Sequence, residues 1–261
     1  MPWIEANGAS FHFEMSGAGD STVVLIHEAG GSLRSWDALF QLLPGMGHVL
    51  RYDQRGFGLS ERCTNISQQN MVADLAALLD ALDLHQPVHL IGSAIGATVA
   101  LAFAAEQPGR VASVVATSPV TGGIPDAAKA FLEQRAGLLE AQGMRAIADA
   151  SLQRSWPSAL RQDVEAFEQY RGRFLANDPR AFAALTRAFI TVDLSGCYDR
   201  IACPTLLVGC SHDAIKPPCE CAQLASLLAR GRFAQAESGH FIALQSPQLL
   251  AALIKDFWSS L

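Results

Sequence analysis

Short apolar runs alternate with longer amphipathic stretches along most of the 261-residue chain. An apolar run of about four to eight residues is typical of a strand buried on both faces of a sheet. Such runs predict strands at residues 22–26, 48–51, 87–91, 111–116 and 205–208, after an earlier strand at residues 10–15. Apolar residues at helical spacing predict helices at residues 71–82, 96–106 and 247–260. Strands separated by helices favour an α/β fold with a mainly parallel sheet covered on both faces.

Polar residues refine two of these predicted helices. Apolar positions form one face of residues 71–82, so Asp74 and Asp80 are expected to point outward. Ser246 is expected to cap the last helix, with Pro247 at its first position.

The pattern changes between residues 121 and 198. This segment has no convincing strand and contains helical stretches at residues 127–142, 144–155, 161–175 and 179–192. These helices interrupt the alternation of strand and helix. They predict a helical cap, residues 121–198, inserted into a core formed by residues 1–120 and 199–261.

Composition narrows the class of protein. Hydrophobic residues make up 50% of the chain and charged residues 17%, which supplies a large core and argues against disorder. The net charge of −6 and the lack of a basic run make nucleic acid an unexpected partner. Residues 84–105 carry no formal charge and are long enough to span a bilayer. They contain Pro87, Gly92 and Gly96, so a buried strand, a turn and a helix are expected there instead of a membrane span.

The cysteines and the amino terminus favour a cytoplasmic protein. Residues 1–10 include Glu5 and show no basic, apolar leader. Without a leader, the six cysteines are expected to be reduced thiols. Cys219 and Cys221 lack the two-residue gap of a zinc or redox pair, so no metal site is predicted.

A sharp strand-to-helix turn is indicated at residues 91–96. Such a turn needs small residues two positions before and two after its apex, because side chains there would collide with neighbouring backbone. Gly92 and Gly96 satisfy this requirement when Ala94 is the apex. With Ser93 at the apex, isoleucines would occupy both crowded positions, so Ser93 is expected to point elsewhere. The turn predicts a nucleophile elbow in which alanine stands at the nucleophile position.

An acidic residue and then a histidine follow this turn along the chain. Asp213 lies on the loop after the strand at residues 205–208, and His240 lies just before the last helix. The order apex, Asp, His is that of the catalytic triad in α/β-hydrolases. In such a triad the acid orients the imidazole, which removes a proton. Asp213 and His240 are therefore predicted to be the orienting acid and the general base.

Two further motifs show that the chain resembles the α/β-hydrolase superfamily over nearly its whole length. Residues 53–60, Asp-Gln-Arg-Gly-Phe-Gly-Leu-Ser, are similar to its Asp-x-Arg-Gly-x-Gly-x-Ser turn. Residues 27–31 are similar to its His-Gly-x-x-Gly oxyanion loop, except that Glu28 stands where glycine is usual. The resemblance implies the α/β-hydrolase fold. His27 is expected to brace this loop, and Asp53 and Arg55 to be structural.

Within the superfamily, the chain resembles the 3-oxoadipate enol-lactonases. Residues 30–37, 51–53 and 143–150 are similar to the corresponding stretches of those enzymes. Related ester, lactone and carbon–carbon hydrolases share these features. The resemblance implies a small lactone, ester or β-dicarbonyl substrate from aromatic-ring catabolism, and no cofactor.

Alanine at the apex limits the chemistry. It has no hydroxyl to form an acyl-enzyme, and loss of such a serine costs about a millionfold in turnover in a protease example. The backbone N–H groups of Ala29 and Ile95 are expected to form an oxyanion hole, worth about 3–4 kcal/mol per donor. His240, oriented by Asp213, remains available as a base for water or substrate.

Three hypotheses follow. In the first, Ala94 replaces a natural serine and traps substrate in an ordinary enol-lactonase or esterase. In the second, Ala94 is native, and His240 activates water or serves lyase, isomerase or cofactor-free oxygenase chemistry. In the third, an inactive protein binds a small molecule in its capped pocket. The second is favoured, because Glu28 is another departure beside the same pocket and because a dead pocket needs no oriented base.

Other side chains are candidates for the pocket. Glu28 would be a second acid or base there, or would turn its carboxylate to solvent. Trp156 would line the pocket from the cap or pack within the cap. Arg34, Arg154 and Arg187 would hold a substrate carboxylate, as an acidic lactone requires, although solvated helix faces explain arginines equally well. The expected partner is a small carbonyl compound, without nucleic acid or membrane, and the cap helices could also form a homodimer.

Overall fold

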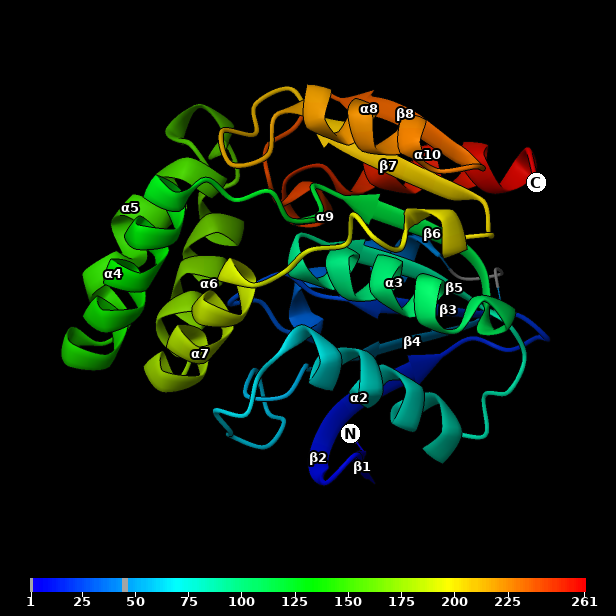
Figure 1. The fold of residues 1–261 in the computed structure, drawn as a ribbon, viewed down its shortest axis with the longest axis horizontal. Helices are drawn as coiled ribbons and strands as arrows, with labels where there is room; N and C mark the ends of the chain where they lie inside the picture. The colour runs from blue at the N-terminus through cyan, green and yellow to red at the C-terminus, as the bar shows by residue number, and fades with distance from the viewer. Residues whose placement is uncertain (1, 44–46) are drawn as a thin grey trace.

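A computed structural model describes residues 2–43 and 47–261, and an eight-stranded sheet runs through this part of the chain (Figure 1). The strands are β1 (Trp3–Ala6), β2 (Ala9–Ser16), β3 (Thr22–Ile26), β4 (His48–Tyr52), β5 (Val88–Ser93), β6 (Val111–Thr117), β7 (Thr205–Cys210) and β8 (Gly231–Ala236). Their order in space is β1-β2-β4-β3-β5-β6-β7-β8. The pairs β1–β2 and β2–β4 are antiparallel and the other pairs are parallel, so the predicted mainly parallel α/β sheet is confirmed.

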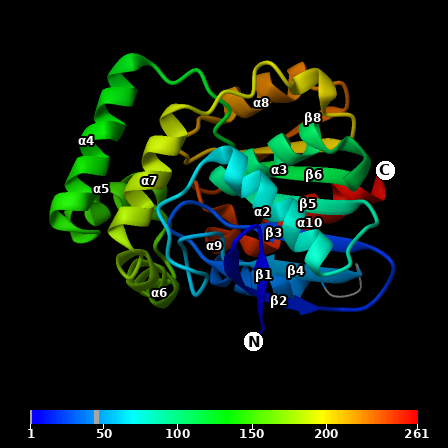
Figure 2. The same ribbon diagram turned by 60° about the horizontal axis from the view of Figure 1, so that its bottom comes forward.

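Helices cover both faces of this sheet. One face carries α2 (Gln68–Ala81), α3 (Ile95–Glu106) and α8 (Pro218–Leu227), and the other carries α1 (Asp37–Leu42), α9 (Ile242–Gln245) and α10 (Pro247–Ser259). Successive side chains of a strand point to opposite faces. In β3, Val24 and Ile26 therefore pack beneath α2 and α3, while Val23 and Leu25 pack against α1 and α10. Figure 2 shows α2 crossing in front of the strands and α10 behind them.

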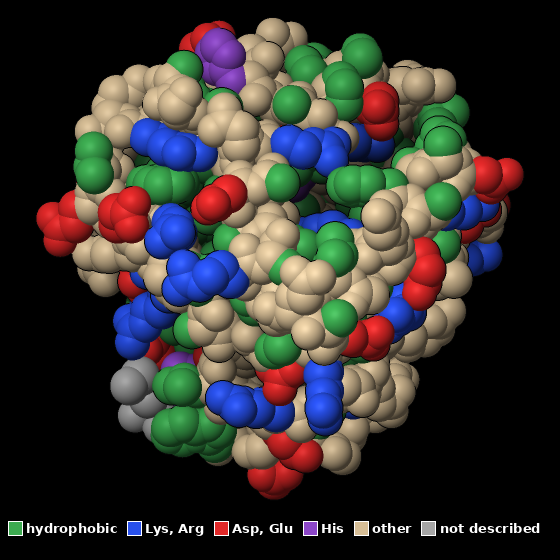
Figure 3. Space-filling model, turned by 90° about the vertical axis from the view of Figure 1, so that its left-hand side faces the viewer, with side chains coloured by type: hydrophobic (Ala, Val, Ile, Leu, Met, Phe, Trp, Pro, Cys, Tyr) green, Lys and Arg blue, Asp and Glu red, His purple; other side chains and the backbone are tan. Residues whose placement is uncertain are grey.

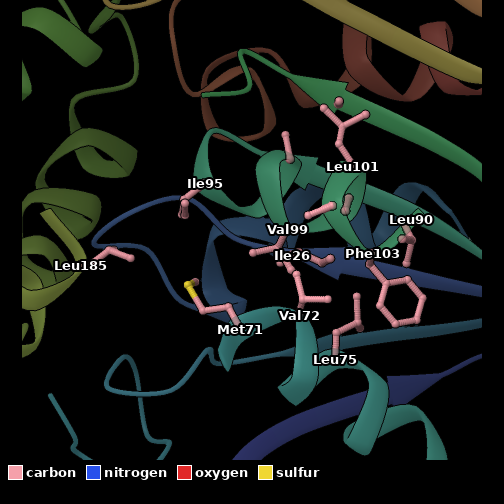
Figure 4. Close-up of a cluster of buried hydrophobic side chains, with 14 of the residues drawn as sticks. Ile26, Met71, Val72, Leu75, Leu90, Ile95, Val99, Leu101, Phe103 and Leu185 are labelled. Atoms are coloured by element: carbon pink, nitrogen blue, oxygen red, sulfur yellow. The ribbon is translucent and has the colours of Figure 1, made fainter. Parts of the chain in front are cut away.

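The larger hydrophobic cluster continues from the sheet into the inserted helices. Figure 4 shows Phe103 of α3 and Leu90 of β5 at one end of the cluster. At its other end, Ile95 and Leu185 extend it toward the inserted helices. The sheet and these helices thus share one buried apolar core.

The inserted helices occupy the segment between β6 and β7. They are α4 (Asp126–Gln142), α5 (Arg145–Ser155), α6 (Val164–Leu175) and α7 (Pro179–Ile190). In Figure 1 they lie at the left, beyond the ends of the strands. The side-chain nitrogen of Asn177, between α6 and α7, donates a 2.9 Å hydrogen bond to the Gly30 carbonyl just after β3. The cap therefore contacts the loop that leaves β3.

Several elements differ from the sequence prediction. Asp74 does not point outward: it is buried and pairs with Arg55, whereas Asp80 is exposed as expected. Ser246 occupies the N-cap position of α10, but its side chain makes no capping hydrogen bond. The prediction missed β1 and β8, because edge strands are partly exposed and lack a continuous apolar run. It also missed α1 and α8.

Residues 84–105 include β5, a tight turn and all of α3 except its last residue, as predicted. Across residues 2–43 and 47–261, every helix is too short or too polar to cross a membrane. Met1, the first residue of the amino-terminal stretch considered above, lies outside the described residues.

Candidate active site

Ala94 occupies the apex of the turn between β5 and α3. Its backbone has φ +49° and ψ −110°, a conformation that costs a residue with a Cβ about 1–3 kcal/mol. A methyl group on Gly96 would lie 2.0 Å from the carbonyl oxygen of Ile26, and one on Gly92 would lie 2.4 Å from the nitrogen of Ala97. The two glycines are therefore required by close backbone contacts on both sides of the apex.

Ser93 precedes the apex and is the last residue of β5. Its side chain is 1% exposed, and its hydroxyl has no hydrogen-bond partner within the part of the chain that the structure describes. The His240 imidazole is therefore not hydrogen bonded to Ser93. The apex presents a methyl group, and the neighbouring hydroxyl does not take its place.

His240 and Asp213 are joined in a buried pair. Nδ1 of His240 lies 2.7 Å from Oδ2 of Asp213, which also accepts a 2.7 Å hydrogen bond from the Ser118 hydroxyl. Oδ1 accepts from the backbone N–H groups of Ile215 (2.8 Å) and Lys216 (2.9 Å). Burial alone would raise the pKa of Asp213, but the hydrogen bond and charge of His240, with the Lys216 and Ser118 donors, lower it. A charged carboxylate keeps the imidazole proton on Nδ1, so Nε2 of the neutral ring carries the free lone pair.

Two backbone N–H groups are available near this pair. Ile95 is the first residue of α3, so its N–H has no acceptor within the helix. The N–H of Ala29 donates to no other described residue. His27 holds the loop in place, because its Nδ1 donates to the Glu28 carbonyl (2.8 Å) and its Nε2 accepts from the N–H of Gln54 (3.0 Å). These contacts leave the N–H groups of Ile95 and Ala29 free for an external acceptor.

The Glu28 carboxylate lies inside the protein and does not turn to solvent. The residue is 2% exposed, and its Oε1 accepts a 2.7 Å hydrogen bond from the Ser35 hydroxyl. A methyl group on Gly31 would lie 2.2 Å from the same oxygen, so the carboxylate packs against its own loop. Burial raises the pKa of Tyr170 on α6 well above its ordinary value, and the negative charge of Glu28 raises it further. Glu28 therefore lies between the loop and the cap.

Aromatic side chains from the cap cover this loop. A methyl group on Gly30 would lie 2.6 Å from the Phe182 ring and 3.0 Å from the Phe174 ring, which leaves room only for glycine there. Trp156 is buried within the cap, with its ring centroid 5.8 Å from that of Tyr170. Its indole N–H donates to a backbone carbonyl of the cap. Trp156 is thus engaged in packing within the cap.

Two of the three arginines expected to hold a carboxylate are engaged by acids elsewhere. Their ion pairs are Arg34 with Glu14 (3.3 Å) and Asp37 (3.4 Å), and Arg187 with Glu133 (2.8 Å) and Glu140 (2.6 Å). Both partners of Arg187 lie on exposed cap surface, so a contact between Arg187 and substrate stays a prediction. Arg34 is held near β2 and α1 by its two acid partners. Arg154 has no such acid partner among the described residues.

Arg135 on α4 is a cation that the sequence interpretation missed. Its guanidinium lies 5.2 Å from the Phe182 ring centroid and donates a 3.1 Å hydrogen bond to the Ser151 hydroxyl. Burial, and then the positive charge of Arg154, lower the pKa of Arg135 to about 10. No carboxylate in the described chain forms an ion pair with it. Figure 3 views the molecule from the cap side and shows basic side chains spread around a hollow in this face.

Ser118 was also missed, although it follows a predicted strand at the edge where the other loops meet. No cluster of three or more His, Cys, Asp or Glu side chains within the described residues could hold a metal ion. The six cysteines are free thiols in the structure.

Sequence comparison identifies relatives of the chain. A profile of the alpha/beta hydrolase family matches residues 23–253. A Variovorax paradoxus (strain S110) protein, named RutD and assigned as a candidate carbamate hydrolase, is 32% identical over 219 residues, 79% of each chain.

Solved structures agree with this match. The enol-lactonase from Burkholderia xenovorans LB400 is 25% identical with a TM-score of 0.92, covering 99% of this chain and 100% of that chain. A thermophilic esterase from Thermogutta terrifontis, with malate bound, is 25% identical with a TM-score of 0.92, covering 100% of this chain and 99% of that chain. The expected resemblance to enol-lactonases is confirmed. Because the family profile spans most of the sequence and the fold agrees over its whole length, this chain belongs to the alpha/beta hydrolase family.

Proposed function

We propose that this protein hydrolyses a small ester, lactone or carbamate. The nucleophile is a water molecule activated by His240, in the role that a serine hydroxyl has in other members of the family. One observation carries the proposal: Ala94 occupies the apex of the elbow, while the His240–Asp213 pair is intact at 2.7 Å. The names of the relatives support a carbonyl substrate, since they include an enol-lactonase, an esterase and a candidate carbamate hydrolase. Hydrolysis of each of these classes can pass through a tetrahedral oxyanion.

In the proposed reaction, His240 carries one proton from the attacking water to the departing group of the substrate. Nε2 of His240 takes a proton from water, and the resulting hydroxide attacks the carbonyl carbon. The N–H groups of Ala29 and Ile95 hold the oxygen that becomes negative. When the intermediate collapses, His240 returns the proton to the departing oxygen or nitrogen. Asp213 stabilises the imidazolium between these two transfers and stays ionised.

Glu28 supports a native alanine over a single replaced serine. Its carboxylate is hydrogen bonded to Ser35, packed against Gly31 and near Tyr170 of the cap. Burying a carboxylate is costly unless its surroundings compensate for the lost hydration. A change at Ala94 alone does not account for this second, accommodated departure beside the same pocket.

The Ala94→Ser variant tests the proposal directly. We expect the unaltered protein to turn over at least one of a 4-nitrophenyl ester, a carboxylated enol-lactone and an aryl carbamate. Intact-mass spectrometry during turnover should show no acyl adduct on the unaltered protein. Ala94→Ser should not raise kcat/KM by more than about tenfold, because the proposed reaction already has its nucleophile in the water activated by His240.

Ser93→Ala is the matched control, since it removes the hydroxyl beside the apex, and it should leave kcat/KM unchanged. Loss of activity in this control would show that the Ser93 hydroxyl is the nucleophile and would overturn the proposal. An inert parent with a gain of several orders of magnitude in Ala94→Ser would show an ordinary serine hydrolase. If both proteins are inert but bind ligand, the protein is a binding protein and the proposal is wrong.

Arg135 supports a substrate that carries a negative charge. A half-buried guanidinium without an acid partner is costly, and the neighbouring Arg154 is also positive. Arg135 packs on one side of Phe182, whose ring also touches Gly30 beside the proposed oxyanion donor Ala29. A substrate carboxylate reaching past this ring would supply the missing partner. The malate bound to the esterase relative likewise carries carboxylate groups.

Arg135→Gln should raise the KM for a carboxylated ester by about tenfold or more, because a hydrogen bond to a charged group is worth about 1.5–3 kcal/mol. The KM for the matching neutral methyl ester should change little. Steady-state kinetics on the two esters measures this difference. Arg145→Gln, a change at an exposed cap arginine, serves as the control. Equal losses on the charged and the neutral ester would show that Arg135 has only a structural role.

A further inference from the structure

A cavity lies between the cap and the core, and neither His240 nor Asp213 lines it. Its volume is about 230 Å³. His12 of β2 lines it together with residues from three further segments: residues 31–34, the turn at residues 53–62, and the α6–α7 junction at residues 173–178. This volume is below the range of about 300–1,000 Å³ typical of pockets for drug-sized ligands. The cavity therefore suits a compact ligand.

The acids in this cavity are already engaged. Oδ1 of Asp53 accepts from the N–H of Leu33 (2.7 Å), while Oδ2 accepts from the N–H of Leu59 (2.9 Å) and contacts His12 (2.7 Å). Asp178 caps α7 by accepting from two backbone N–H groups of its first turn. Both carboxylates therefore serve the fold, and in the described chain neither forms an ion pair with an arginine of the cavity.

Three arginines line the same cavity. Arg62 is exposed, and no carboxylate in the described chain pairs with it. Arg173 has no acid partner in the described chain either, and its guanidinium lies 6.0 Å from the centroid of the Tyr170 ring. Arg34 joins them from the loop side while pairing with acids near β2 and α1. The protein as a whole carries a net charge of −6, so three arginines around one cavity are opposite in sign to its net charge.

We propose that this cavity binds a small, multiply charged anion, a di- or tricarboxylate or a phosphate, through Arg62 and Arg173. Guanidinium groups hold carboxylates and phosphates with paired, charge-assisted hydrogen bonds. Arg62 comes from the core and Arg173 from the cap, so a bound anion bridges the two. Asn177, which also lines the cavity, already links the cap to Gly30 through a 2.9 Å hydrogen bond. Anion binding therefore stabilises the contact between the cap and the oxyanion loop.

Titration calorimetry and thermal unfolding of the full chain test this site. The probes are citrate, malate and inorganic phosphate, each at matched ionic strength against sodium chloride. We expect at least one probe to bind and to raise Tm. Arg62→Gln and Arg173→Gln should each weaken this binding by about tenfold or more, and the double variant should abolish it. Citrate binding more tightly than phosphate would assign a carboxylate ligand, and the reverse order a phosphate.

Two control variants separate this site from other basic surfaces. Arg145→Gln makes the same charge change on an exposed part of the cap and should leave binding unchanged. Arg135→Gln alters the proposed substrate site and should also leave it unchanged. If binding is lost in Arg135→Gln and retained in the double variant, the anion occupies the catalytic pocket and the second site is refuted, while the proposed function stands. Absence of binding by all three probes, or equal loss in Arg145→Gln, also refutes it.

Discussion

His240→Ala is expected to lower kcat/KM for ester hydrolysis by about 10²–10⁴, the range that general acid–base catalysis contributes. Ala94 offers no nucleophile, so Nε2 of His240 is the base that the proposed reaction uses to activate water. Asp213→Asn should cause a loss of similar size, because an amide cannot hold the same tautomer or stabilise the imidazolium. Initial rates on the best of the ester, lactone and carbamate substrates measure both effects, with Tm recorded for each variant.

His212→Ala is the matched histidine control. His212 adjoins the acid in sequence, but its side chain is exposed and contacts Glu237. It should retain activity within about twofold, because an exposed side chain of this kind contributes little to the buried site. A folded His240→Ala protein with the parental rate would exclude His240 as the base. A comparable loss in His212→Ala would mean that any disturbance of the loop after β7 lowers activity, and that the loss in His240→Ala does not identify the base.

Arg55→Met is expected to lower the free energy of unfolding by about 3–5 kcal/mol, because it leaves a buried carboxylate without its partner. The side chains of Arg55 and Asp74 are only 6% and 3% exposed. Two guanidinium nitrogens of Arg55 contact the two oxygens of Asp74, and Asn7 donates a further 2.8 Å hydrogen bond to that carboxylate. Urea unfolding followed by circular dichroism gives the change in free energy.

Two variants check that burial of the lone carboxylate is the cause. Arg55→Met combined with Asp74→Leu removes both charges and should recover part of the loss. Arg187→Met breaks ion pairs with Glu133 and Glu140 on the exposed cap surface, and should shift the urea midpoint little. The explanation fails if the double variant is as unstable as the sum of its single changes, or if Arg187→Met is equally damaging.

Local pattern was enough to predict the buried strands and the elbow. The strand predicted at residues 22–26 coincides with β3, because its side chains are apolar and are buried on both faces of the sheet. The apex at Ala94 followed from the glycines two residues to either side. A side chain on Gly92 would collide with the backbone of the turn itself, and one on Gly96 with the Ile26 carbonyl at the end of the adjacent strand β3. The order of Ala94, Asp213 and His240 could also be read directly from the chain.

Pattern failed where a residue's environment comes from distant segments. Helical spacing predicted that Asp74 points outward, yet its carboxylate is buried and is bound by Arg55 and Asn7 from distant segments. The strand β8 escaped prediction because it lies at the edge of the sheet and is only partly buried. Among the arginines, sequence alone could not separate those neutralised by acids from Arg135, which packs on Phe182 without one.

The sequence by itself determined the parallel sheet, the methyl group at the sharp turn, and the presence of an acid and a histidine in hydrolase order. Only the tertiary structure decided which polar groups meet. Ser118 reaches Asp213 across 95 residues, and Asn177 reaches Gly30 across 147. Steric rules of the turn act on neighbouring backbone and can be recognised in a short stretch of chain. Burial and charge pairing depend on which distant segments the closed fold brings into contact.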